Sequence, residues 1–235
     1  EKAITPKTRL FVINSPSNPS GIAYSTEELA AIGEVLRKHP RILIATDDMY
    51  EHILWTGKPF VNILNVCPDL YDRTIVLNGV SKAYSMTGWR IGYAAGPQKL
   101  MKAMTNVQSQ STSNPASISQ AAAEAALNGP QECVAEMVTA FKARHDWLVA
   151  ALNALPGVTC LEGDGTFYAF ADFNQAIRNL GLKDDLELAE KLLEGGVALV
   201  PGSAFGTPGC LRLSFAVSLD TLKSAVERIA AVLGQ

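Results

Sequence analysis

Several features that would narrow the function of this 235-residue chain are weak or absent in its sequence. Its 20 Lys and Arg nearly balance 23 Asp and Glu, so no strongly basic surface is predicted and nucleic acid is not an expected partner. Its apolar runs are far shorter than the ~20 residues that a membrane-spanning helix needs. Its first residues lack the basic and apolar pattern of a signal peptide. We therefore expect a cytoplasmic protein without a membrane partner.

Cysteine is scarce and gives no sign of a disulfide framework or a zinc site. Cys67, Cys133, Cys160 and Cys210 are widely separated, and none forms a Cys-x-x-Cys pair. This spacing is typical of ordinary buried thiols in a reducing compartment, so no metal is predicted. Hydrophobic residues, in contrast, make up 48% of the chain, which is enough to bury the core of one large domain or two small ones.

The first half of the chain alternates short β-branched runs with amphipathic stretches. Residues 25–28, Ser-Thr-Glu-Glu, have the form of a capping box. A helix is predicted to follow, with Leu29, Ile32 and Leu36 on its apolar face. Because continuous apolar strands alternate with helices, the pattern predicts an α/β fold whose mostly parallel sheet has helices on both faces. The predicted strands are residues 9–13, 41–46, 74–77 and 91–95.

The second half has a different pattern and predicts a smaller α/β domain. One long helix is expected over residues 131–155, after the Asn-Gly-Pro sequence that ends at Pro130. We therefore predict two domains, residues 1–130 and residues 131–235, with the second entered through the long helix. Within it, short strands are predicted near residues 166–172, 197–200 and 211–216, and helices near residues 184–193 and 218–233.

Polar side chains follow three of the predicted strands at the points where the strands end. A loop with Asn18 follows the first strand, and Asp47 and Tyr50 follow the second. Lys82 follows the third strand, with Arg90 eight residues later. Because ligands of open parallel sheets bind outside the carboxyl ends of the strands, these side chains could converge on an anionic, ring-bearing ligand. Taken singly, each also has a structural explanation: a turn, a helix cap, a solvated lysine or an ion pair.

Four segments resemble the class I and II, fold-type I aminotransferases that depend on pyridoxal 5'-phosphate (PLP), and among them the aspartate aminotransferase family. The most specific is residues 81–93, Ser-Lys-Ala-Tyr-Ser-Met-Thr-Gly-Trp-Arg-Ile-Gly-Tyr. The others, in the family's order, are residues 14–21, 47–50 and 211–215. The resemblance covers essentially the whole chain but only the C-terminal three-fifths of the family pattern. It implies the C-terminal part of the PLP-binding large domain and a small α/β C-terminal domain.

The N-terminal part of the family pattern is not found in this sequence. A truncated protein, a cleaved protein or a natural fragment would each explain this. Half of a parallel sheet would expose an edge and an apolar face to water, which folded chains normally avoid. We therefore predict that the chain needs the remaining part, or a partner, to stay soluble and active.

The resemblance also implies roles for individual side chains. Lys82 resembles the catalytic lysine, whose amine forms a Schiff base with the aldehyde of PLP and moves protons. Asp47 resembles the carboxylate that faces the pyridine nitrogen and keeps it protonated. Asn18 and Tyr50 resemble the pair that hydrogen-bonds the ring's phenolic oxygen, and Asn18 also borders the substrate. Arg90 resembles the arginine that binds the cofactor phosphate.

The resemblance assigns the substrate's α-carboxylate to Arg212, as a bidentate clamp that orients the bonds of the α-carbon. Residues 201–206 resemble a family loop near this arginine, although no direct contact is predicted for them. The aromatic residues of the segment 165–168 are predicted to lie in the core. Asp48 is predicted to have a structural role.

The function implied by the resemblance is transamination by a ping-pong mechanism in a homodimer. An amino acid, with aspartate favoured, would give its amine to PLP, and a 2-oxo acid such as 2-oxoglutarate would collect it. Two alternatives stay open. A lyase, synthase or decarboxylase of the same fold would use the same lysine but break another bond of the α-carbon. A ligand-sensing regulatory domain of aminotransferase type would be fused to a DNA-binding module.

Overall fold

The computed structural model describes residues 1–234, and their contacts divide the chain into two compact units. The first unit consists of residues 1–16 and 23–136, and the second of residues 17–22 together with the chain from residue 137 onward. No pattern in the sequence indicated that the loop 17–22 groups with the second unit. The division into domains at residue 130 stays a prediction.

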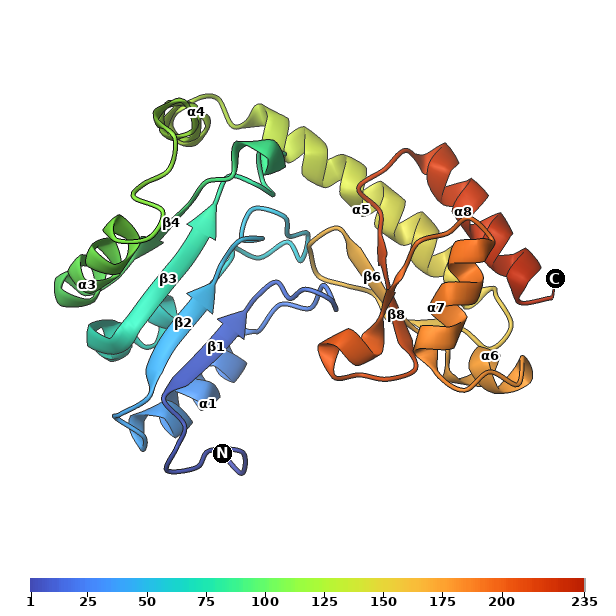
Figure 1. The fold of residues 1–235 in the computed structure, drawn as a ribbon, viewed down its shortest axis with the longest axis horizontal. Helices are drawn as coiled ribbons and strands as arrows, with labels where there is room; N and C mark the ends of the chain where they lie inside the picture. Colours follow the sequence, from blue (N-terminus) through green and yellow to red (C-terminus); the bar gives the residue numbers. More distant parts are fainter. Residues whose placement is uncertain (235) are drawn as a thin grey trace. The chain divides into compact units, whose positions relative to one another are not determined.

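The first unit is built on a four-stranded sheet in the order β1-β2-β3-β4 (Figure 1). Strands β1, β2 and β3 are parallel, whereas β4 pairs antiparallel with β3. The sheet is thus mostly parallel, as predicted, and its fourth strand runs antiparallel because no crossover helix precedes it. The strands are β1 (Leu10–Asn14), β2 (Leu43–Asp47), β3 (Thr74–Gly79) and β4 (Gly92–Ala95). The helices are α1 (Thr26–Arg37), α2 (Ile63–Val66), α3 (Gln98–Ser109), α4 (Ser117–Asn128) and the start of α5 (Glu132–Asn153), with 3-10 turns at Pro68–Arg73 and Thr87–Trp89.

Helix α1 begins where the capping box predicted it. The Ser25 hydroxyl accepts from the Glu28 amide, and the Glu28 carboxylate accepts from the Ser25 amide. These bonds satisfy backbone donors that a helix leaves unpaired at its N-terminus. The apolar face of α1 then packs on one face of the sheet and forms the core of this unit. The core residues are Ile13, Leu29, Leu36, Ile42, Ile44, Ile63, Cys67 and Leu70.

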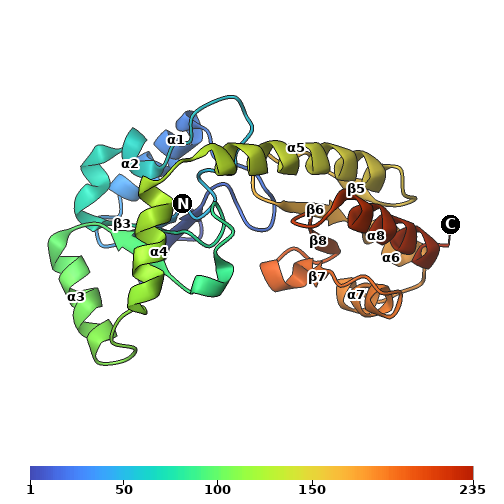
Figure 2. The same ribbon diagram turned by 90° about the horizontal axis from the view of Figure 1, so that it is seen from above.

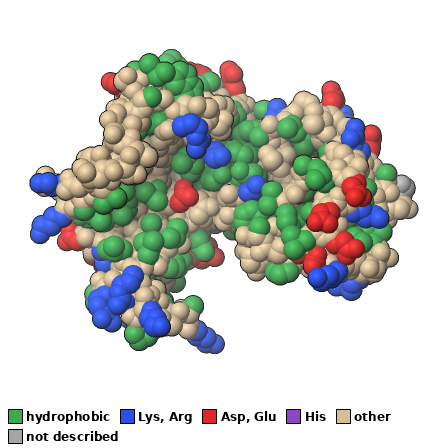
Figure 3. Space-filling model, viewed as in Figure 1, with side chains coloured by type: hydrophobic (Ala, Val, Ile, Leu, Met, Phe, Trp, Pro, Cys, Tyr) green, Lys and Arg blue, Asp and Glu red, His purple; other side chains and the backbone are tan. Residues whose placement is uncertain are grey.

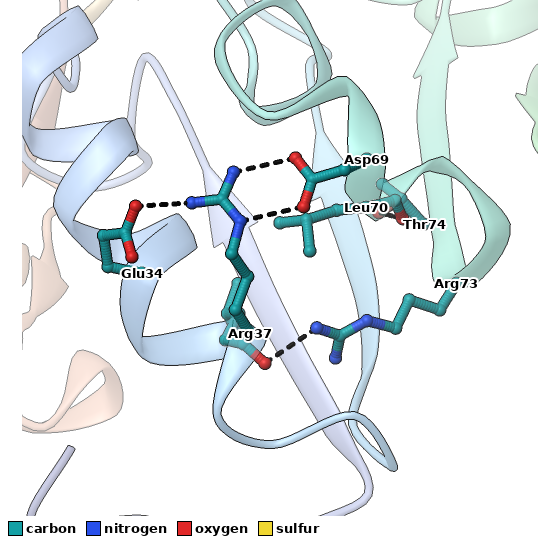
Figure 4. Close-up of polar contacts among 7 residues, drawn as sticks. Glu34, Arg37, Asp69, Leu70, Arg73 and Thr74 are labelled. Carbon is teal, nitrogen blue, oxygen red and sulfur yellow. Dashed lines mark hydrogen bonds and ion pairs between the residues drawn. The ribbon is translucent and has the colours of Figure 1, made fainter.

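Two arginines fix the far end of α1 (Figure 4). Arg73 donates to the carbonyl oxygens of Leu36, His39 and Ile42, in the last turn of the helix and in the segment that follows it. Arg37 makes two hydrogen bonds to the Asp69 carboxylate. This guanidinium holds the pKa of the Asp69 carboxyl below its usual range. Arg73 therefore completes the helix end, and Arg37 ties α1 to the 3-10 turn before β3.

The two faces of this sheet differ. Figures 1 and 2 show α1 and α2 on one side and α3 and α4 toward the other. Near β1 and β2 the second face is open, because Leu10 and Val12 are 53% and 57% exposed and Leu43 is also exposed. Hydrophobic side chains are visible over this part of the first unit in Figure 3. An apolar face of this kind is what the sequence led us to expect.

The second unit has an antiparallel sheet in the order β5-β6-β8-β7. Its strands are β5 (Thr159–Cys160), β6 (Tyr168–Asp172), β7 (Val200–Pro201) and β8 (Cys210–Ser214). Its helices are the larger part of α5, α6 (Asn174–Asn179), α7 (Asp185–Glu194) and α8 (Leu219–Val232), with a 3-10 turn at Gly202–Phe205. The long helix and the last two helices lie close to their predicted positions.

The four cysteines are free thiols, but they are not all buried. Cys67 and Cys160 are buried as predicted, and burial raises the pKa of the Cys160 thiol to about 11. Cys133 is exposed because it lies on the first turn of α5, which corrects the prediction for this residue. Among the helices of residues 1–234, none combines the length and the apolar character that crossing a membrane requires.

Candidate functional site

The carboxyl ends of the parallel strands bring polar side chains to one edge of the first sheet. In the strand register, Asn14 at the end of β1 pairs with Asp47 at the end of β2, which pairs with Leu77 of β3. The Asn14 amide also donates to the Asp47 carbonyl oxygen at 3.0 Å. Asp47 therefore lies at the sheet edge where ligands of open parallel sheets bind.

Asp47 and Asp48 are neighbours in sequence but point to opposite faces of the sheet. Successive side chains of a strand alternate, and Asp47 shares its face with Leu43, which is exposed. Asp48 is only 1% exposed and accepts hydrogen bonds from the Thr46 hydroxyl and the Asn62 amide. Burial raises the pKa of the Asp48 carboxyl despite these two donors. The open-face carboxylate is thus Asp47, and Asp48 supports the turn beneath it.

Asp47 and Tyr50 belong to the turn that follows β2. One carboxylate oxygen of Asp47 accepts from the Met49 amide at 3.2 Å, which fixes the start of the turn. Tyr50 is buried, and its backbone carbonyl accepts from the Ile53 amide. The turn is therefore ordered by its own backbone, with the carboxylate at its start and the phenol three residues later.

Lys82 is half-buried on the turn that follows β3. At the point where this turn leaves the sheet, a Cβ atom on Gly79 would lie 3.1 Å from the Cα of Gly92, so glycine allows β3 and β4 to approach closely. The Asn78 side chain donates to the Glu51 carboxylate and accepts from the Gly79 amide. The Asn78–Glu51 bond ties the turn with Lys82 to the turn after β2.

Arg90 lies at the end of the 3-10 turn before β4. Its backbone is left-handed, with φ of 49°, and its side chain is exposed. One guanidinium nitrogen donates to the Thr87 carbonyl at 2.9 Å. This single bond to the backbone leaves further donors for an anion, because a guanidinium carries five N–H groups.

Arg212 and Asn18 meet in the second unit. Arg212 lies in the middle of β8, and its Nη1 donates to the Oδ1 of Asn18 at 2.8 Å. The centre of the guanidinium lies 4.4 Å from the ring of Tyr168 and 5.1 Å from the ring of Phe205. Contact with two aromatic faces and one amide restricts this cation in three directions.

The direct contact of Phe205 with Arg212 corrects the sequence analysis, which predicted none for the loop 201–206. Asp185, at the start of α7, holds this loop because its carboxylate accepts from the Ser203 amide at 2.8 Å. Although burial alone would raise it, the pKa of Asp185 is lowered by the amide donors of Ser203 and Gly209. Tyr168 lies in the core as predicted, and its ring also contacts the arginine.

The structure thus assembles the predicted residues in two sets. Asp47, Tyr50, Lys82 and Arg90 belong to the first unit, and Asn18 and Arg212 to the second. Sequence reasoning missed Glu51 and Asp185, whose partners come from other strands or loops. No group of three or more His, Cys, Asp or Glu side chains able to hold a metal ion occurs in the part of the chain that the structure describes.

Comparison with solved structures defines the fold. The aspartate aminotransferase of Rhizobium meliloti superposes with a TM-score of 0.93 at 49% identity, over 99% of this chain and 60% of that one. The aspartate aminotransferase of Thermus thermophilus with maleate superposes with a TM-score of 0.86 at 41% identity, over 98% of this chain and 58% of that one. The fold is therefore that of the PLP-dependent transferases, of which the chain resembles the C-terminal part.

Sequence comparison gives the family. The family model of the class I and II aminotransferases matches residues 1–229, so the chain belongs to this family. The aspartate/prephenate aminotransferase of Nitrosomonas europaea is 61% identical over 240 residues, which cover 99% of this chain and 60% of that protein. The chain thus spans about 60% of the length of this curated relative.

Proposed function

We propose that this chain is part of a PLP-dependent aminotransferase that moves the amino group of an L-amino acid to a 2-oxo acid. The observation that carries the proposal is the placement of an amine and a carboxylate after neighbouring strands, at one edge of the sheet. Lys82 follows β3, and Asp47 ends the neighbouring strand β2 on the open face. Family membership and the names of the relatives support the same reaction.

The side chains of the first unit fit PLP by their chemistry. An amine suits the aldehyde of the cofactor, a carboxylate its pyridine nitrogen, a phenol its phenolic oxygen and a guanidinium its phosphate. These groups would be supplied by Lys82, Asp47, Tyr50 and Arg90, with Asn18 also assigned to the phenolic oxygen. When bound, PLP supplies an electron-accepting ring that weakens the bonds of the substrate's α-carbon.

The chain's own residues would then bind and orient the substrate and move one proton. The Arg212 guanidinium binds the α-carboxylate, and its contacts with Asn18, Tyr168 and Phe205 limit how the substrate can rotate. With PLP bound, the Nζ atom of Lys82 would carry the proton that leaves the α-carbon to the C4′ carbon of the cofactor. The Asp47 carboxylate would favour a proton on the pyridine nitrogen by its negative charge.

Finer features of the proposal come from the relatives and the resemblance. The relatives' names mention aspartate and prephenate, which supports aspartate as amino donor and a 2-oxo acid such as 2-oxoglutarate as acceptor. We also propose a ping-pong cycle, a homodimer as the complete enzyme and a cytoplasmic location. The division into a cofactor domain of residues 1–130 and a small domain of residues 131–235 belongs to the same proposal.

The test uses the full-length protein that contains this sequence. Borohydride reduction with PLP, followed by peptide mass analysis, is expected to find the cofactor attached to Lys82. The visible absorption of bound PLP should change on addition of aspartate, with release of a 2-oxo acid. The variant Lys82→Ala should lose attachment and turnover, whereas Lys99→Ala, which removes an exposed lysine of α3, should keep both.

Attachment of PLP to another lysine would contradict the assignment of Lys82. Release of carbon dioxide, or of an eliminated group in place of a 2-oxo acid, would support a decarboxylase or lyase of the same fold. Spectral change without any product would support the regulatory alternative.

A further inference from the structure

His145 is a buried histidine on α5 that the proposed reaction does not use. Its side chain is 2% exposed, and both ring nitrogens have partners. The Nε2 atom lies 2.9 Å from the Gly163 amide, which can only donate. Nε2 must therefore be the acceptor, and the proton of the neutral ring lies on Nδ1, 2.9 Å from the Asp146 carboxylate.

Gly163 begins the segment that holds the loop with Asn18. The amides of the next two residues, Asp164 and Gly165, both donate to the Gly21 carbonyl at 2.9 Å. Gly21 closes a tight loop, because its amide donates to the Ser17 carbonyl at 2.8 Å. Its φ is +75°, and a Cβ atom there would lie 2.9 Å from the Gly165 carbonyl oxygen, so the two segments pack directly.

The same imidazole also contacts the residue that follows the strand of Arg212. Its ring meets the ring of Phe215 edge-on, with centroids 5.9 Å apart. Phe215 is fully buried one residue beyond β8, the strand that carries Arg212. The Phe215 amide donates to the Phe167 carbonyl, just before the Tyr168 ring that contacts Arg212. His145 therefore contacts the segment that holds the Asn18 loop and the residue that follows the strand of Arg212.

We infer that His145 is a positioning residue for carboxylate binding: its neutral imidazole holds the 163–165 segment, and through it Asn18, in place against Arg212. The inference rests on the proposed function for the role of Arg212. His145 itself touches neither Asn18 nor Arg212 in the contacts above, so it acts through the backbone of Gly163 and through Phe215. A bond to a backbone amide and a ring contact are both directional, which makes this position sensitive to side-chain geometry.

Three variants of His145 in the full-length protein with PLP separate its contacts. His145→Gln can place an acceptor near the Nε2 position. His145→Asn is too short to reach Gly163 but can still donate to Asp146. His145→Phe keeps a ring against Phe215 and loses both hydrogen bonds. The dissociation constant of maleate, a non-reacting dicarboxylate, is then measured for each variant together with its melting temperature.

We expect maleate to bind about tenfold more weakly to the Asn and Phe variants, because both lose the hydrogen bond to the Gly163 amide, and within about threefold of the original protein to the Gln variant. For an amino acid substrate the loss should appear in KM more than in kcat. Unchanged maleate binding in the Asn and Phe variants, with a lowered melting temperature alone, would show a purely structural role and overturn the inference.

Nitrogen NMR gives a readout that does not depend on the reaction. The imidazole should show Nδ1 protonated and Nε2 unprotonated, and the side-chain nitrogens of Arg212 should shift in His145→Phe but not in His145→Gln. The opposite tautomer, or an unmoved Arg212, would contradict the inference. If transamination itself fails in the original protein, these NMR results still decide whether His145 positions Arg212.

Discussion

Each unit of this chain has a pair of adjacent aspartates, and in each pair one member is buried. Asp48 lies beside Asp47 in the first unit, and Asp185 beside Asp184 in the second. Both buried residues are 1% exposed, yet their pKa values move in opposite directions. Burial is the largest cause that raises the pKa of Asp48, and the neighbouring carboxylates of Asp47 and Glu51 raise it further. Asp48 accepts from two neutral side chains, whereas Asp185 accepts from backbone amides.

The comparison teaches that burial alone does not decide the charge of a carboxyl group. Backbone amides at a loop and a helix start are fixed dipoles that point at the carboxylate and favour its ionised form. A hydroxyl and a side-chain amide can reorient, so they compensate less for the loss of water. The loop with Phe205 is thus held by a charge, and the turn below Asp47 by a carboxyl group that is more easily protonated.

The largest effect is expected for Asp185→Ala. Removal of this acceptor leaves the Ser203 amide without its carboxylate partner, so we expect a loss of about 3 kcal/mol in unfolding free energy. The loop with Phe205 should also loosen, which would weaken carboxylate binding by Arg212. Urea unfolding of the full-length protein measures the first effect and maleate titration the second.

The adjacent Asp184 is the matched control. It caps α7 by accepting from the Leu186 and Glu187 amides, so Asp184→Ala should cost only about 1 kcal/mol and leave maleate binding unchanged. An equal loss of stability in the two variants would break the comparison, because the buried member would then contribute no more than a half-buried helix cap.

A smaller loss is expected for Asp48→Ala. The variant leaves the Thr46 hydroxyl and the Asn62 amide without their acceptor, but it also removes a carboxyl group whose burial is costly. We expect a loss of about 2 kcal/mol. Asp47→Ala, in contrast, should change unfolding free energy by less than about 1 kcal/mol and act on bound PLP. A stability effect larger for Asp47 than for Asp48 would contradict the alternation of faces.

Much of the first unit could be predicted from the sequence because its signals are local. The capping box at Ser25, the apolar strands and the polar residues at strand ends are each readable within a few positions. Helices α3 and α4 were not predicted, and neither has a side-chain cap that would mark its start. Both therefore lack the N-terminal signal on which the prediction of α1 depended.

The contacts around Arg212 could not be predicted in the same way. The partner Asn18 lies 194 residues away in sequence, and the rings of Tyr168 and Phe205 come from two further segments. The family resemblance identified Arg212 as a candidate, but only folding brings its neighbours together. The same holds for His145, whose role depends on a backbone amide that no residue type indicates.

The smallest expected effects are those of pH on stability. The contributions of the two buried carboxyl groups to the free energy of unfolding should depend on pH in opposite directions. The pKa of Asp185 is lowered in the folded chain, so its contribution to stability is present above the unfolded pKa of about 4 and is lost as pH falls through the lower folded pKa. The pKa of Asp48 is raised, so its contribution is fully present below about pH 4 and is lost as pH rises through the higher folded pKa.

Asp185→Asn and Asp48→Asn remove one titration each and make this difference measurable. Urea unfolding between about pH 3 and pH 7 gives the free energy of the original protein minus that of each variant. For Asp185 this difference should grow as pH rises to about 4, and for Asp48 it should shrink as pH rises above about 4. If the two differences changed with pH in the same direction, the amides around Asp185 would not outweigh the effect of burial on its pKa. The loop beside Arg212 would then be held no more firmly than the turn below Asp47.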